Sequence, residues 1–525
     1  MTELTAMQAA CWFGRNTRGA LSGVAAHLYV EFDGRDIDPA KLRQALVRVC
    51  AQHPMLRLRV DDEGRQAIMP QEASPALEVE DFRLLTGEDA ARRLLEKREV
   101  WTHQRLDLLA GQAARFSLSL LGDGVCRLHV DTDMIAIDPP SFCVLMEDLS
   151  GWYLHPERQP GRLPDWFDWC ERTRSDPGLR AAREKDRLYW QARLADIPPA
   201  PALPLANTQA VQARSHRLAT VLPPDIHLAL KRIARSRSIT QSTLMLGLFS
   251  LVLARHTGDR RFRLNVPMFW RTPLVADVEH IVGDFANVLI LGVETAGAES
   301  PAALCARLGE QMRELLAHSA YPGVNLMRDL SRRCGDTQLA PVVVTAALDL
   351  PGGALLSPKV KEVFGEMNWA ISQGPQVALD AQFAALDSGL LINWDIRLDA
   401  LPQAWITAAF EDFTATVRRI AAAPQDFDQP MLAPADPRPA HGQPAGESMA
   451  RRVLDIYLQV LAVGDGVLAD GRSDFISLGL RPRHLHVIAS RLDEEFGTAL
   501  PVAQLLRCRN ADDVAQLLNA AASSQ

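Results

Sequence analysis

The sequence lacks the marks of membrane, metal-binding and nucleic-acid-binding proteins. It has no run of about 18 apolar residues, no basic leader after Met1 and no block of basic residues, and its net charge is −8. Its few cysteines are scattered, without a C-x-x-C pair or a histidine spacing typical of zinc. We therefore expect a reduced, cytoplasmic protein that uses no metal ion and binds neither nucleic acid nor a membrane.

The composition is that of a large globular protein. The 525 residues are 47% hydrophobic, which is enough for several domains with sizeable cores. Prolines between 198 and 204 cannot continue a helix, and prolines recur from 424 to 447 with little periodic hydrophobicity. We therefore expect four segments: a lobe at 1–180, a second lobe at 181–423, a linker at 424–447 and a helical domain at 448–525.

Two acidic residues connect a predicted strand to a predicted helix. Polar residues from 127 to 133 alternate with apolar ones, which is the period of a half-buried strand. Asp138 precedes prolines and an apolar helical stripe, so it is predicted to cap that helix. Asp133, Asp138 and Ser141 thus lie between core elements. Taken alone, the two acids indicate no more than strand-end solvation and helix capping.

A second polar set occurs near residue 380. The stretch from 371 to 382 is predicted to form one strand. Within it Gln376, Ala378, Asp380 and Gln382 share one parity and apolar residues take the other, which predicts one polar face. Thr345 stands in an apolar run. By residue type alone, Asp380 is a solvent-facing strand residue and the Thr345 hydroxyl bonds to backbone.

The order of the motifs resembles the heterocyclization domains of nonribosomal peptide synthetases. The spacing Asp133-x4-Asp138-x2-Ser141 is similar to their core signature, whereas ordinary condensation domains carry His-His-x3-Asp-Gly. Asp133 therefore stands where the first histidine would be, and Met134 where the catalytic one would be. Further stretches resemble family motifs in the right order, at residues 4–15, 53–60, 198–204, 263–273, 282–290, 341–348 and 371–382.

The resemblance implies a fold and an activity. The expected fold is α/β, with two chloramphenicol-acetyltransferase-like lobes in a V and a tunnel between them. The implied reaction transfers a carrier-bound acyl group to the amine of carrier-bound Cys, Ser or Thr, then closes a thiazoline or oxazoline ring with loss of water. Such chemistry serves siderophore or other secondary-metabolite biosynthesis.

The resemblance also implies site residues. The family assigns proton transfer to Asp380, positioned with Thr345, and we expect a buried ion pair between Asp138 and Arg271. The remaining site residues carried over from the motifs are Asp133, Ser141, Asp284, Gln376 and Gln382.

The last 75 residues or so resemble a carrier-protein domain. The stretch Asp474-Phe475-Ile-Ser-Leu478-Gly479 is similar to the carrier motif, but Pro482 occupies the place of the modified serine. Proline has no hydroxyl for a phosphopantetheine arm, so we expect no covalent cofactor here. Donor and acceptor carrier proteins should supply the arms in trans, which predicts a stand-alone enzyme.

Other interpretations stay open. Departures from the family pattern, such as Ala286, Ala346 and Gly374, are consistent with a domain that performs only condensation or only cyclodehydration. A catalytically impaired scaffold that binds carriers is a further alternative. Asp131-Thr-Asp133 also resembles the Asp-x-Asp of haloacid-dehalogenase phosphatases, an interpretation that leaves the other motifs unexplained.

Overall fold

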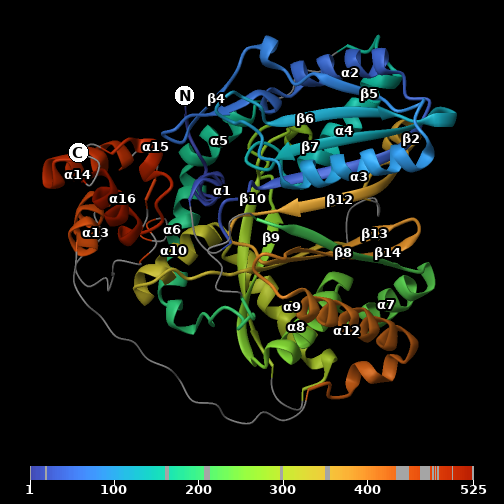
Figure 1. Cartoon of the computed structure of the whole chain (residues 1–525). Coiled ribbons are helices and arrows are strands. Elements are labelled where there is room, and N and C mark those ends of the chain that lie inside the picture. Colours follow the sequence, from blue (N-terminus) through green and yellow to red (C-terminus); the bar gives the residue numbers. More distant parts are fainter. Residues whose placement is uncertain are drawn as a thin grey trace.

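The computed structural model describes residues 2–17, 21–159, 165–205, 213–295, 299–348, 355–432, 449–461 and 473–522, the last without positions 474, 476, 477, 479, 482, 483 and 499. Two large mixed sheets face each other, and the C-terminal helices pack at one side (Figure 1). The α/β fold expected from the sequence is confirmed.

The first sheet has five strands in the order β12-β2-β7-β6-β5. Helices α2 (Pro39–Gln52) and α4 (Pro139–Leu154) pack on one face and α3 (Gly87–His103) on the other (Figure 1). Asp138 caps α4 as predicted, Asp38 caps α2 in the same way, and β6 pairs with β7. The strands and remaining elements of this half are β2 (His27–Arg35), β5 (Leu77–Asp81), β6 (Ala114–Leu120), β7 (Val125–Asp133), β12 (Glu366–Gln373), α1 (Ala6–Asn16), α5 (Trp166–Ser175), α6 (Pro177–Gln191), and the small sheet of β1 (Thr2–Glu3), β4 (Arg65–Ile68) and β3 (Leu58–Val60).

The second sheet has six strands in the order β10-β9-β11-β13-β14-β8. Its main supporting helix, α8 (Gln241–Thr257), is apolar on nearly every face and is buried. No single described helix is both long and apolar enough to cross a bilayer; α7 and α8 reach that threshold only together, with a 99° bend between them. The other elements are β8 (Ser215–Leu222), β9 (Arg261–Phe269), β10 (Ala286–Glu294), β11 (Val342–Ala347), β13 (Leu379–Leu386), β14 (Gly389–Arg397), α7 (Pro224–Ser236), α9 (Pro301–Ala317), α10 (Gly323–Cys334), α11 (Pro358–Phe364) and α12 (Gln403–Ala422).

The segment from 371 to 382, predicted as one strand, is divided between the two sheets. β12 ends at Gln373 as the edge of the first sheet, and β13 begins at Leu379 in the second. Between them Gly374 and Pro375 form a turn, because proline cannot donate to a strand ladder. Gln376 lies in this turn with φ of 66°, so its predicted place on the strand face is wrong.

The C-terminal residues form a helical domain with its own core, here called the tail domain (449–522). It comprises α13 (Met449–Val460), α14 (Leu485–Phe496), α15 (Val502–Leu505) and α16 (Ala511–Ala522). Before it, residues 424–428 form a short 3-10 helix whose Phe427 is buried in the core of the second sheet. Residues 424–428 therefore pack as part of the second lobe, whereas the sequence predicted a linker that begins at 424.

Gly365 is required where α11 turns into β12. Its φ is +80°, and a Cβ there would lie 1.8 Å from the carbonyl oxygen of Asp33. We therefore expect Gly365→Ala to lower the free energy of unfolding by about 2 kcal/mol or more. Gly87→Ala, at a helix start with open space around it, is the matched control and should change stability by less than about 0.5 kcal/mol in urea unfolding. Equal effects of the two substitutions would contradict this assignment.

Candidate active site

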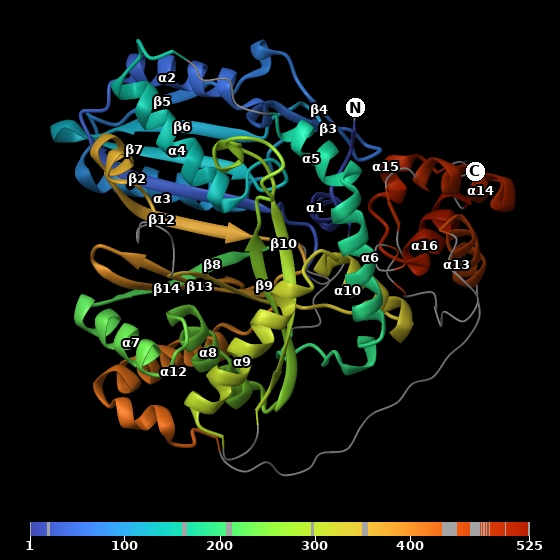
Figure 2. The same cartoon turned by 180° about the vertical axis from the view of Figure 1, so that it is seen from behind.

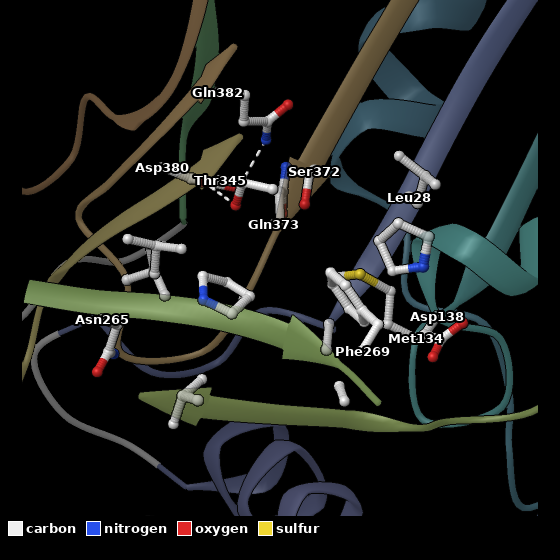
Figure 3. Close-up of a pocket in the computed structure, with 18 of the residues that line it drawn as sticks. Leu28, Met134, Asp138, Asn265, Phe269, Thr345, Ser372, Gln373, Asp380 and Gln382 are labelled. Carbon is white, nitrogen blue, oxygen red and sulfur yellow. Dashed lines mark hydrogen bonds between the residues drawn. The ribbon is translucent and has the colours of Figure 1, made fainter. Parts of the chain in front are cut away.

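A cavity of about 390 Å³ lies where the two lobes meet. Its walls come from α1, β2 and α4 on one side and from β9, β10, α10, β11 and β13 on the other. In Figure 3, Thr345, Asp380 and Gln382 cluster at one part of the pocket, while Leu28, Met134 and Phe269 lie near Asp138 further along it. The cavity therefore combines a polar and a mainly apolar region.

The structure brings Thr345 and Asp380 together. β11 and β13 are parallel neighbours, and the Thr345 hydroxyl donates to Oδ1 of Asp380 at 3.3 Å. The Gln382 amide donates to Oδ2 of the same carboxyl group at 2.6 Å (Figure 3). All three residues line the cavity and are partly exposed. Asp380 is thus held from both sides and faces the place where a substrate would lie.

A second carboxylate group lies beside Asp380 on the neighbouring strand. Asp395 on β14 is directly opposite Asp380, and Arg217 on β8 is directly opposite Asp395. Arg217 donates two hydrogen bonds to Asp395, at 2.7 and 2.8 Å. Burial, and then the negative charge of Asp395, raise the pKa of Asp380 to about 7, although Gln382, Thr345 and Arg217 oppose the shift. The Asp380 carboxyl can therefore take up and release a proton near neutral pH.

The sequence did not identify three members of this polar strand face: Arg217, Asn393 and Asp395. Asn393 donates to the Oε1 atom of Gln382 at 2.9 Å, which orients the Gln382 amide toward Asp380. Asn393 and Asp395 share one parity on β14, and this was the only sequence signal for them. The polar strand face comprises Thr345, Asp380, Gln382, Asn393, Asp395 and Arg217.

Asp138 lies in a junction between the lobes. Its side chain caps α4 through the Ser141 amide at 2.8 Å and accepts the Phe285 amide at 2.9 Å. The predicted ion pair is confirmed: an Arg271 nitrogen lies 3.7 Å from Asp138, and both side chains are largely buried. Arg271 also donates to the Ser141 hydroxyl at 2.8 Å, and that hydroxyl donates to the Gly283 carbonyl. The interlobe junction (Asp138, Ser141, Arg271, Gly283 and Phe285) therefore joins α4 to the segment between β9 and β10.

Asp284 is a buried acid in the cavity wall. One oxygen accepts the Ala286 amide at 3.0 Å, and Oδ2 has no hydrogen-bond partner among the described residues. Burial and the nearby Asp138 raise the pKa of Asp284 well above its usual value. Asp284 is therefore a buried carboxyl group in the cavity wall, with one oxygen that no described residue contacts by a hydrogen bond.

Asp133 lies outside the cavity. It is fully buried, is paired with Arg15 and accepts the Ile135 amide at 3.1 Å, so solvation at a strand end, the simple interpretation, is wrong. Met134, one residue later, lines the cavity instead. Asp133 therefore belongs to a buried ion pair and not to the cavity lining.

Three further predictions concern Asp131, Gln376 and Pro482. Asp131, the proposed phosphatase nucleophile, is fully buried and bonded to His27 and Gln104, so no phosphoester can reach it. Gln376 lines the cavity from its turn rather than from a strand. Pro482 lies outside the described residues.

Comparisons with known proteins agree with this geometry. A family model described as "Condensation domain" matches residues 1–433. Phenyloxazoline synthase MbtB of Mycolicibacterium paratuberculosis is 41% identical over 81% of this chain and 36% of its own length. Pyochelin synthetase PchE of Pseudomonas aeruginosa is 31% identical over 88% of this chain and 32% of its own. The chain thus spans about a third of these relatives.

Solved structures show the same architecture. The cyclization-docking bidomain of EpoB, a nonribosomal peptide synthetase protein from Sorangium cellulosum, superposes with a TM-score of 0.70 at 28% identity, covering 80% of this chain and 85% of that one. The nonribosomal peptide synthetase FmoA3 superposes with a TM-score of 0.69 at 30% identity, covering 87% of this chain and 48% of that one.

Removing one partner of the interlobe ion pair should destabilise the protein. We expect Arg271→Ala to lower the free energy of unfolding by about 3–5 kcal/mol, because Asp138 then stays buried without its cation. Arg83→Ala removes a partner from an exposed pair with Asp81 and should change the free energy of unfolding very little, because solvent screens exposed pairs. Chemical denaturation of both variants measures the difference in the free energy of unfolding. A small loss of stability for Arg271→Ala would show that the ion pair does not stabilise the junction.

Proposed function

Because the chain belongs to the condensation-domain family, we propose that it is a heterocyclization enzyme of nonribosomal peptide biosynthesis. It joins a carrier-bound acyl group to carrier-bound Cys, Ser or Thr and closes the product to a thiazoline or oxazoline. The observation that carries the proposal is the Thr345–Asp380 pair in the wall of an interlobe cavity. Similarity to a phenyloxazoline synthase and to a cyclization domain supports it.

The reaction divides into three steps. The amine attacks the acyl thioester, so that a C–N bond forms and the carrier thiol leaves. The side-chain thiol or hydroxyl then adds to the new amide carbon, which gives a ring that bears a hydroxyl group and an N–H. Loss of the N–H proton and of hydroxide, which leaves as water after protonation, creates the C=N bond.

Asp380 suits the last step. Hydroxide is a poor leaving group, so a proton must reach it while the ring nitrogen loses one. A carboxyl group with a pKa of about 7 is present in both protonation states at neutral pH and can donate one proton and accept the other. Thr345 and Gln382 hold the two oxygens of Asp380 in place.

The condensation step has no histidine at the usual place. Met134 lines the cavity there and can neither accept nor donate the proton of the attacking amine. The acyl transfer then depends on placing the amine beside the thioester, because proximity supplies much of the barrier reduction.

Substrates reach the cavity on phosphopantetheine arms of partner proteins. Position 482 of this chain is a proline and cannot carry such an arm, which favours donor and acceptor carriers supplied in trans. A carrier-binding scaffold without activity, or a domain for one step only, is the alternative. The intact contacts around Asp380 favour a catalyst.

Reconstitution separates these functions. The chain is incubated with a donor carrier and with carriers loaded with Cys, Ser or Thr, and the acceptor carrier is weighed as an intact protein. A product lighter than the amide by one water identifies cyclodehydration, whereas the amide alone identifies condensation. If neither product forms although carriers bind, the chain is a scaffold.

Replacing the proposed acid–base group should stop ring formation selectively. In the reconstitution, Asp380→Asn should lower the rate of cyclodehydration by about 10²–10⁴-fold, because the amide cannot transfer the protons, and the uncyclised amide should accumulate. Asp387→Asn, an exposed residue beyond the same strand, is the control and should leave both rates unchanged. Retained ring formation in Asp380→Asn would exclude this carboxyl as the proton carrier.

The pH dependence of the cyclodehydration rate should depend on the negative charge of Asp395. Its negative charge raises the pKa of Asp380, so Asp395→Asn should lower that pKa, and Arg217, freed from its partner, should lower it further. The ionised form of Asp380 then persists to lower pH. In a pH–rate profile of cyclodehydration, we expect the change in rate near pH 7 to shift to lower pH in this variant. If the profile does not shift, a group other than Asp380 causes the change in rate near pH 7.

A further inference from the structure

The polar strand face continues into a row of apolar residues. On the polar strand face, Thr345 pairs with Gln382. Two residues further along the same strands, Ala347 pairs with Ala384, which is opposite Leu391 on β14. Residues two apart on a strand share one face and lie about 7 Å apart along it, and all of these residues line the cavity. The cavity wall beside the proposed proton carrier therefore changes from polar to apolar within one step of the strand pairing.

Apolar side chains of the first sheet line the same cavity. Val30 on β2 pairs with Ala370 on β12, and both line the cavity together with Met367. The Ser372 amide donates to Asp395 at 2.8 Å, which joins the end of β12 to the polar strand face. Both overall views show β12 as the strand of the first sheet that lies nearest β13 and β14 (Figures 1 and 2). The two sheets thus supply the walls of one apolar region, here called the alanine pocket (Val30, Ala347, Met367, Ala370, Ala384 and Leu391).

The six residues of the alanine pocket are all apolar. The charged residues in the described cavity lining are Asp138, Arg217, Asp284, Arg328 and Asp380, and none of them belongs to this pocket. A charged group placed among the six side chains would lose its hydration without gaining an ion pair from them, which is unfavourable. An uncharged apolar group would instead be stabilised by leaving water. The pocket therefore selects an apolar occupant.

The chemistry of ring formation indicates which part of the substrate this occupant is. The acceptor contributes its amine and its side-chain thiol or hydroxyl to the ring, and its carbonyl stays on the carrier arm. The donor contributes the amide carbon, which becomes a ring atom, and the rest of the donor acyl group is attached to that carbon. With Asp380 beside the ring nitrogen and the leaving hydroxyl, this substituent lies next to the pocket that begins one strand step away.

We propose that the alanine pocket holds the substituent of the donor acyl group and that Ala347 and Ala384 determine the largest substituent that fits. The inference rests on the proposed function, because it assumes that an acyl group is transferred and cyclised beside Asp380. The donor is then an uncharged apolar acyl group and not an aminoacyl group, whose ammonium would enter the pocket. Methyl side chains at the two paired positions leave the space that larger side chains would fill.

The test compares donors in the reconstitution with intact carriers. The donor carrier bears a benzoyl, acetyl or glycyl group, and the acceptor carrier is weighed. We expect the unmodified chain to use benzoyl about tenfold or more better than acetyl or glycyl in kcat/KM, because only benzoyl fills the apolar pocket. Ala347→Leu should slow the benzoyl donor about tenfold and leave the acetyl donor unchanged. Ala346→Leu, at an exposed position of the same strand outside the cavity lining, is the matched control and should change neither rate.

Leu391→Ala is the converse variant, because it enlarges the pocket. It should raise kcat/KM for a naphthoyl donor relative to benzoyl by about fivefold or more, since the larger ring system then fits. This variant keeps the proposal testable if Ala347→Leu does not fold. Equal use of benzoyl, acetyl and glycyl by the unmodified chain, or an unchanged donor preference in the folded variants, would overturn the proposal.

Binding separates this proposal from the proposed function. Isothermal titration with the N-acetylcysteamine thioesters of benzoic and acetic acid requires no turnover. We expect the benzoyl thioester to bind about tenfold more tightly than the acetyl thioester, and Ala347→Leu to abolish that difference. If no donor yields any product, the proposed function is rejected, and the titration still decides whether the pocket holds the acyl substituent. Equal affinities of the two thioesters for the unmodified chain would contradict the assignment of the pocket.

Discussion

The ion pair of Asp138 with Arg271, together with the backbone amides that donate to Asp138, holds the two lobes in the arrangement on which the cavity depends. Its carboxylate caps α4 of the first lobe and accepts a backbone amide next to β10 of the second, with Arg271 beside it. Burying these charges has a desolvation cost, which is offset only in a geometry that satisfies all partners. The junction therefore fixes one arrangement of walls that neither sheet could define alone.

The proposed acid–base group lies away from this junction, on the polar strand face. Arg217 pairs with Asp395, and burial together with the negative charge of Asp395 keeps the pKa of Asp380 elevated. A buried acid whose pKa is raised toward neutrality is typical of acid–base sites. The motif Asp-x4-Asp-x2-Ser thus contributes architecture, and the proposed proton carrier, Asp380, lies more than 200 residues later in the sequence.

Sequence reasoning reached some of these residues and missed others for physical reasons. Capping by Asp138 and the alternation around Asp380 are local patterns, so they were predictable; the Asp138–Arg271 pair came from motif resemblance. Asp395 and Arg217 meet only because β14 and β8 pair across the sheet, and no local pattern records that register. The break at Gly374–Pro375 was visible as a turn signal, but the apolar alternation on both sides of it suggested one continuous strand.

The sharing of β12 between distant parts of the chain affects how the protein is made. The first sheet begins with β2 and is completed only when residues 366–373 add to the edge of β2. During synthesis, that edge emerges from the ribosome long before its partner, with unpaired backbone groups that invite pairing with other chains. A truncated chain that ends before residue 366 would keep that edge exposed and should be prone to aggregate.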